Sequence, residues 1–84
     1  MRKYYWITRD GKNKIYSSLR VEDNYNIYIW KADTKPIFTK RKINKGMICS
    51  IDIFQFEKLY NFTPKKGSCE LVEMDLSIKR KNKK

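Results

Sequence analysis

The alternation of apolar and polar positions predicts that the first half of the chain is built from β-strands. Segments 3–9, 14–21 and 25–31 show the period-two pattern of strands, rich in aromatic and β-branched residues. The pairs between them, Asp10-Gly11 and Asp23-Asn24, are typical of tight turns. Three consecutive strands joined by short turns predict an antiparallel meander. Residues 37–39 predict a short additional strand.

The second half of the chain predicts a strand, a helix and a final strand. Residues 47–51 are apolar and predict the strand. Asp52 is a suitable helix N-cap, with Gln55 three residues later, as in a capping box. Apolar residues then recur at helical spacing, and Asn61 is a suitable end. Residues 69–79 alternate again, which predicts the last strand.

This order of elements predicts an α+β fold. We expect a single small antiparallel sheet of four or five strands, with an N-terminal meander and one short helix before the last strand. A small barrel-like sheet is the alternative. Because 84 residues can build only one core, residues 1–78 are expected to form a single domain. The basic tail 79–84 is expected to be disordered.

The strand at 25–31 has two faces of different character. Ile27 and Ile29 form an apolar face, which we expect in the core. Tyr28 and Trp30 form the other face, which is either a second buried layer or a binding surface. Polar residues follow Trp30 directly, so we expect it at the surface and expect Trp6 in the core.

The charge of the chain suggests an anionic partner. Twenty Lys and Arg stand against nine Asp and Glu, a net charge of +11. Five cations and no acid lie between Lys35 and Lys45, and five more lie in the last six residues. The alternative is that A/T-rich codon usage inflates the lysine content, and that these charges only maintain solubility.

The residue types present argue against catalysis. The chain has no histidine, and its three glycines are too scattered for a phosphate-binding loop. A histidine-free nuclease using Lys, Arg and Tyr is the chemical alternative. Cys49 and Cys69 are expected to be reduced, half-buried thiols, not metal ligands. We therefore expect no enzymatic activity and no cofactor. The sequence contains neither a secretory signal nor an apolar run of membrane-spanning length, which favours the cytoplasm.

Basic residues interleaved with aromatic ones favour nucleic-acid binding. Sheet surfaces that bind single strands combine aromatic rings, which stack on bases, with cations, which contact phosphates. Tyr28 and Trp30, beside Tyr4 and Trp6, would form the stacking platform. The predicted phosphate contacts are Lys31, Lys40, Arg41, Lys42, Lys45 and Arg80. The alternative is that the aromatic rings belong to the core.

The first forty residues contain the run Tyr5-Trp6-Ile7-Thr8-Arg9-Asp10, the later Tyr28-Ile29-Trp30 and the pair Lys35-Pro36. In this pattern, the chain resembles small uncharacterised proteins of phages and mobile elements. The resemblance implies a binding module acting in the cytoplasm of a bacterial host. Besides nucleic acid, the options are an anti-CRISPR-like inhibitor of a host defence enzyme such as a nuclease, and a sponge for a nucleotide signal. A homodimer through an edge strand is one option for the assembly.

Overall fold

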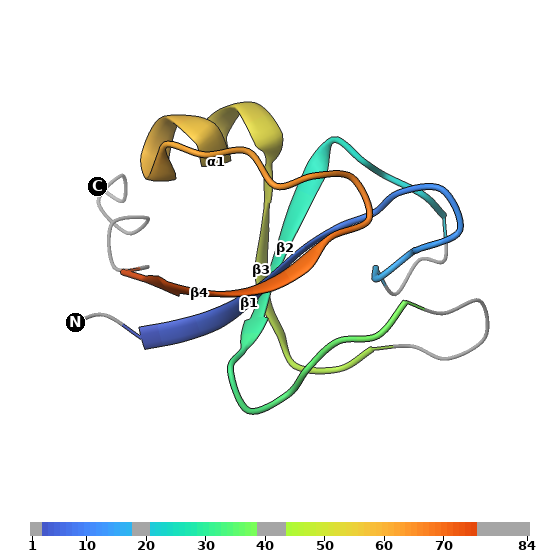
Figure 1. Cartoon of the computed structure of the whole chain (residues 1–84), viewed down its shortest axis with the longest axis horizontal. Coiled ribbons are helices and arrows are strands. Elements are labelled where there is room, and N and C mark those ends of the chain that lie inside the picture. Colours follow the sequence, from blue (N-terminus) through green and yellow to red (C-terminus); the bar gives the residue numbers. More distant parts are fainter. Residues whose placement is uncertain (1–2, 18–20, 39–43, 76–84) are drawn as a thin grey trace.

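The protein is a four-stranded antiparallel sheet with one helix across a face. The computed structural model describes residues 3–17, 21–38 and 44–75. The elements in chain order are β1 (Lys3–Arg9), β2 (Asn26–Lys31), β3 (Met47–Asp52), α1 (Ile53–Tyr60) and β4 (Cys69–Met74). The strand order in the sheet is β3-β2-β1-β4, and α1 connects one edge to the other (Figure 1). The predicted α+β fold, with its helix before the last strand, is confirmed.

One core lies between α1 and the sheet. Ile7 of β1 stands opposite Ile29 of β2, and Ile27 lies further along β2 on the same face. Phe56 is the buried residue of α1, and Met74 completes the cluster from β4. The prediction that the Ile27/Ile29 face is core is confirmed.

The helix begins and ends where the sequence predicts. The Asp52 carboxylate accepts a hydrogen bond of 2.8 Å from the backbone N–H of Gln55, which satisfies a donor that the first turn leaves free. Asn61 adopts the left-handed conformation, with φ of 66°, and ends α1. Beyond it, the Phe62 ring packs edge-on against Phe56 at 5.2 Å. Residues 61–62 thus turn the chain back toward the core.

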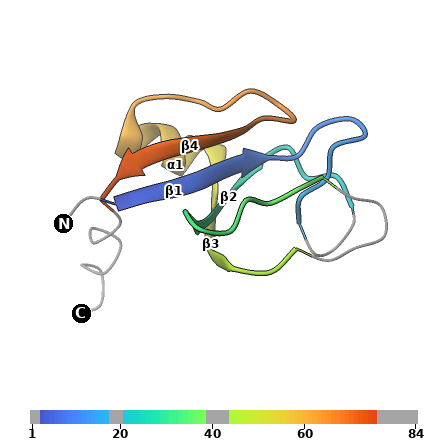
Figure 2. The ribbon, with the colours of Figure 1, turned by 60° about the horizontal axis from the view of Figure 1, so that its bottom comes forward.

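The sheet begins with an N-terminal meander, as predicted, but its strands are β1, β2 and β3, and the second strand predicted at 14–21 is wrong in its described residues. Residues 14–17, the described start of the predicted second strand, form no strand, and Lys14 makes only an isolated bridge with Gly11. β1 pairs directly with β2 on one side and with β4 on the other (Figure 2). The segment after Asp10 instead crosses the sheet face opposite α1, where Tyr16 is buried. The Tyr16 backbone N–H donates to Asp10, so it is not available to a neighbouring strand.

The short strand predicted at 37–39 is also wrong for its described residues. Ile37 and Phe38 form no strand. The Asn44 side chain accepts from the Ile37 N–H and donates to the Ile37 carbonyl, so one amide occupies both backbone groups of Ile37. Thr39 lies outside the described residues, as do residues 76–79 of the last predicted strand and the tail 79–84.

Candidate nucleic-acid interface

The predicted stacking platform of Tyr28 and Trp30 is buried. Trp30 is 1% exposed and Tyr28 is 6% exposed, so neither ring presents a face to a ligand. The helix packs on the opposite face, and Tyr16 covers these two rings instead. The expectation that Trp30 lies at the surface is therefore wrong. Trp6, expected in the core, is only half-buried.

Burial of Trp30 requires a partner for its indole N–H. Trp30 Nε1 donates to Thr8 Oγ1 at 2.9 Å, across the β1–β2 pair. Thr8 is fully buried, and its hydroxyl lies 3.5 Å from the Tyr28 carbonyl, to which it donates. A buried donor without an acceptor would destabilise the fold. These two hydrogen bonds therefore allow the Trp30 indole, which has one polar group, to be buried in the core.

The buried cluster of Tyr16, Tyr28 and Trp30 is a second core. The adjacent residues Arg9 and Asp10 hold the loops around it. Asp10 accepts from the backbone N–H groups of Tyr16, at 2.7 Å, and Asp23, at 3.1 Å. Burial raises the pKa of the Asp10 carboxyl, although these hydrogen bonds oppose the shift. Arg9 donates to the carbonyls of Asn24 and Pro64, each at 2.7 Å. The Arg-Asp pair at the end of β1 is therefore a structural element that holds two connections, the one between β1 and β2 and the one between α1 and β4.

An exposed hollow at the start of β1 brings aromatic and basic side chains together. We call it the Tyr4 hollow; it measures about 580 Å³, and its lining includes Lys3, Tyr4, Tyr5, Lys31, Asp33 and Ile48. Tyr5 stands opposite Lys31 in the β1–β2 pair. Tyr4 is 55% exposed, and both lysines are exposed. This hollow has the combination of rings and cations that was predicted for the Tyr28/Trp30 face.

Trp6 extends this surface along the face opposite α1. Its indole N–H donates to the Ala32 carbonyl at 2.7 Å, and Ala32 also lines the Tyr4 hollow. The Lys35 ammonium lies 5.4 Å from the Trp6 ring centre, within the range of a cation–π contact. Tyr4 and Trp6 alternate onto the same face of β1. A half-buried tryptophan and another exposed lysine thus adjoin the hollow.

Most of the charged side chains around the hollow are lysines, but two carboxylates are present as well. The Lys31 N–H donates to the Gly46 carbonyl at 3.4 Å, which brings the neighbouring, exposed Lys45 to the same end of β2. Among the described lining residues, Asp33 is the one carboxylate. Glu73 of β4 stands opposite Tyr4 and is exposed. The local surface is basic with two acidic groups at its margins.

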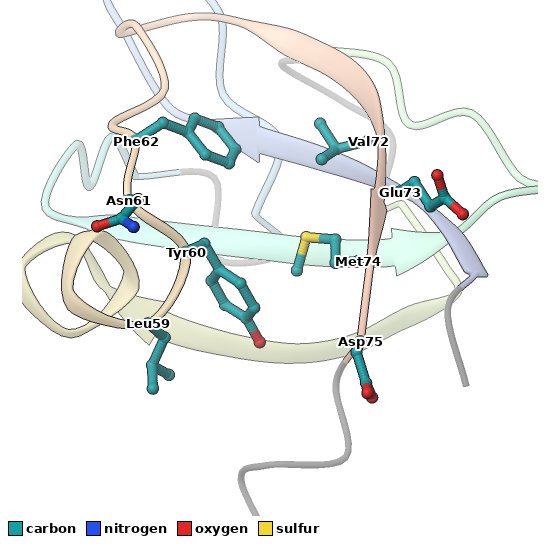
Figure 3. Close-up of a pocket in the computed structure, with 8 residues that line it drawn as sticks. All are labelled: Leu59, Tyr60, Asn61, Phe62, Val72, Glu73, Met74 and Asp75. Carbon is teal, nitrogen blue, oxygen red and sulfur yellow. The ribbon is translucent and has the colours of Figure 1, made fainter.

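A second hollow lies between the end of α1 and β4 and has a different character. We call it the Phe62 hollow; it measures about 320 Å³. Figure 3 shows Phe62 and Val72 pointing toward each other across it, with Tyr60 and Met74 beside them and Glu73 pointing away. Its described lining contains Glu73 and Asp75 but no lysine or arginine. It is therefore unsuited to an anionic ligand.

The structure brings together only part of the predicted binding set. Lys31 lines the Tyr4 hollow and Lys45 lies next to Lys31, whereas Tyr28 and Trp30 are core. Lys40, Arg41, Lys42 and Arg80 lie outside the described residues. Sequence reasoning missed Lys3 and Tyr5, which become neighbours of Lys31 only through the pairing of β1 with β2. Tyr4 was expected beside a platform and instead lines an exposed hollow.

Three further observations concern metal sites, membrane-spanning helices and the two cysteines. Within the part of the chain that the structure describes, no group of three His, Cys, Asp or Glu side chains could hold a metal ion. In that same part, no helix has the length and apolar character needed to cross a membrane. Cys49 and Cys69 are both half-buried, as expected, and burial raises the pKa of the Cys69 thiol.

The chain was compared with known proteins at three levels. No protein-family model, no curated protein and no solved structure matches it.

Proposed function

We propose that this protein is a non-catalytic binding module of phage or mobile-element type whose Tyr4 hollow engages single-stranded nucleic acid. The observation that carries the proposal is the meeting of two tyrosines and two exposed lysines, Lys3 and Lys31, in one open hollow. An exposed ring such as Tyr4 offers a stacking surface, and base–aromatic stacking contributes about 1–3 kcal/mol per base. The lysines beside it would contact the phosphates on either side of a stacked base.

The charge of the whole chain supports the same ligand class. A net charge of +11 attracts polyanions from a distance, and Lys35 and Lys45 extend the local positive surface beyond the hollow. Single strands suit this geometry better than duplexes, because their bases are free to stack on an exposed ring. Sequence preference is expected to be weak, since stacking and phosphate contacts are available to every base.

Fluorescence anisotropy with labelled single- and double-stranded oligonucleotides, titrated over a range of salt concentrations, tests the proposal. We expect affinity for single strands that falls with salt, with a log–log slope of about −0.7 for each phosphate contacted. Lys31→Glu should weaken binding at least about tenfold, because it removes one contact and introduces repulsion. Lys12→Glu makes the same charge change on an exposed residue outside the hollow and is the control. Absence of binding at low salt, or equal losses in both variants, would contradict the proposal.

A protein partner is the second candidate, because the surface carries both signs of charge. Glu73 opposite Tyr4 and Asp33 at the lining would repel a polyanion but could pair with cations of a protein. An inhibitor of a host defence enzyme would use Tyr4 and Trp6 as anchors, residue types enriched at binding hot spots. Affinity capture from nuclease-treated host lysate distinguishes the two. A protein partner survives the treatment and is lost with Tyr4→Ala, whereas partners bridged by nucleic acid disappear.

A further inference from the structure

A third hollow lies on the sheet face opposite α1, toward the other end of β1 from the Tyr4 hollow. We call it the Phe38 hollow; it measures about 340 Å³, and its lining includes Lys14, Tyr16, Lys35, Phe38 and Cys69. Cys69 stands opposite Thr8 in the β1–β4 pair, and Thr8 lies on the same face of β1 as Tyr4. Four residues of a strand separate Tyr4 from Thr8, a span of about 13 Å.

Hydrogen bonds hold the segment 35–38 that forms one wall of this hollow. The Asn44 side chain bonds to this segment and also donates to the Tyr16 carbonyl at 2.9 Å. The Cys69 thiol, a weak donor, lies 3.8 Å from the Pro36 carbonyl. The wall is therefore tied to the buried Tyr16 on one side and to β4 on the other.

The Phe38 hollow combines an open aromatic ring with two cations. Phe38 is 53% exposed, and the Lys14 ammonium lies 5.7 Å from its ring centre. Lys14 and Lys35 are both exposed, and none of the lining residues that the structure describes is acidic. Glu70 follows Cys69 in β4 but alternates to the α1 face. The charge of the hollow therefore suits an anion, and its ring suits a planar apolar group.

Lys35 and Trp6 connect the Phe38 hollow to the Tyr4 hollow. The Lys35 side chain lines the Phe38 hollow, and its ammonium lies 5.4 Å from the Trp6 ring centre. The Trp6 indole N–H donates to the carbonyl of Ala32, which lines the Tyr4 hollow. The two hollows thus lie on one face of the sheet with a half-buried ring and a lysine between them.

We propose that the Phe38 hollow is a second nucleotide subsite, in which Lys14 and Lys35 contact phosphates and Phe38 stacks on a base of the strand held in the Tyr4 hollow. This inference rests on the proposed function and adds to it the path of the strand. The strand runs across the face opposite α1, from Tyr4 past Trp6 to Phe38. It covers the mouth of the Phe38 hollow, which Cys69 lines.

Anisotropy titrations with a single strand of about ten nucleotides test this path. Lys14→Ala should weaken binding about fivefold and reduce the steepness of the log–log salt dependence by about 0.7, because one phosphate contact is lost. Phe38→Ala should weaken binding about tenfold with an unchanged slope, because it removes a stacking ring and no charge. Lys58→Ala removes an exposed cation from α1, on the other side of the sheet, and should have no effect.

Two outcomes of these titrations separate the subsite from the proposed function. If Lys14→Ala and Phe38→Ala both behave like Lys58→Ala while Lys31→Glu still weakens binding, the Phe38 subsite is overturned and the Tyr4 hollow is not. If the wild-type protein binds no single strand at low salt, the proposed function fails, and the subsite fails with it. Circular dichroism checks that each variant is folded.

Thiol alkylation tests the contact in the unaltered protein. Cys69 lines the Phe38 hollow, whereas Cys49, also half-buried, packs against the core on the α1 side and is an internal control. The bound strand should slow the reaction of Cys69 with iodoacetamide, a neutral reagent, several-fold and leave Cys49 unchanged, as measured by mass spectrometry of the peptides. Unchanged alkylation of Cys69 while anisotropy shows the strand bound would overturn the subsite and leave the proposed function standing.

Discussion

Trp30 Nε1 donates a hydrogen bond of 2.9 Å to Thr8 Oγ1 in the interior of the protein. The bond joins the two central strands on the face opposite α1, where Tyr16 covers both Trp30 and Tyr28. It explains why a tryptophan followed by polar residues is core in this protein. Because Trp30 and Tyr28 are buried, the predicted stacking platform in the middle of the sheet is not exposed, whereas Tyr4 at the start of β1 is.

Thr8→Val is expected to destabilise the protein. Valine has nearly the shape of threonine but accepts no hydrogen bond, so the Trp30 indole N–H becomes a buried donor without a partner. Such a group costs about 1–3 kcal/mol of the free energy of unfolding, which urea denaturation measures. Thr8→Ser retains the hydroxyl and should cost less than Thr8→Val. A loss in Thr8→Ser as large as or larger than that in Thr8→Val would contradict a dominant role of the hydrogen bond, because only Thr8→Ser removes the methyl group.

Asp10→Ala is expected to lower the free energy of unfolding more than Thr8→Val does, because the Asp10 carboxylate accepts from two backbone N–H groups. Its removal leaves the N–H groups of Tyr16 and Asp23 without their acceptor. We expect a loss of about 2–4 kcal/mol in the free energy of unfolding, together with faster hydrogen exchange in residues 14–17. Asp33→Ala, at an exposed position, is the control and should change stability by less than about 0.5 kcal/mol.

Tyr4→Ala is expected to weaken nucleic-acid binding without changing stability appreciably. The exposed ring contributes little to the core, but its loss removes a stacking surface worth about 1–3 kcal/mol of binding free energy. Tyr25→Ala removes an equally exposed ring that does not line the Tyr4 hollow. Anisotropy titrations that show the same affinity for both variants would exclude Tyr4 as a stacking residue.

Stability is expected to fall in alkaline solution. Burial raises the pKa of the Tyr16, Tyr28 and Tyr60 phenols above their ordinary value of about 10. Because these phenols ionise more readily in the unfolded chain, the stability they contribute is complete below pH of about 10 and is lost as the pH rises through the folded-state pKa values. Unfolding measured from neutral to alkaline pH should show this decline, and Tyr28→Phe should make it shallower. A pH-independent free energy of unfolding across this range would contradict the assignment.

The local patterns of the chain determined most of its secondary structure. Alternation predicts β1, β2 and the last strand, β4, and an apolar run predicts β3. Asp52 and Asn61 predict the two ends of α1, because capping depends on side chains that bond to their own neighbourhood. Burial of the Ile27/Ile29 face is also predictable from the sequence, since these residues are the apolar half of a strict period-two pattern.

Tertiary structure alone decided which strands pair and which aromatic rings are core. The segment after Asp10 resembles a strand by composition, but the buried Asp10 carboxylate binds its Tyr16 N–H, and β1 pairs with β2 and β4 instead. Trp6 and Trp30 are indistinguishable as residue types; the Thr8 hydroxyl and the cover by Tyr16 make Trp30 the buried one. Lys3, Tyr5 and Lys31 form one surface only because Tyr5 pairs with Lys31 across two strands. These outcomes depend on contacts between residues distant in sequence, which no local pattern of hydrophobicity or charge encodes.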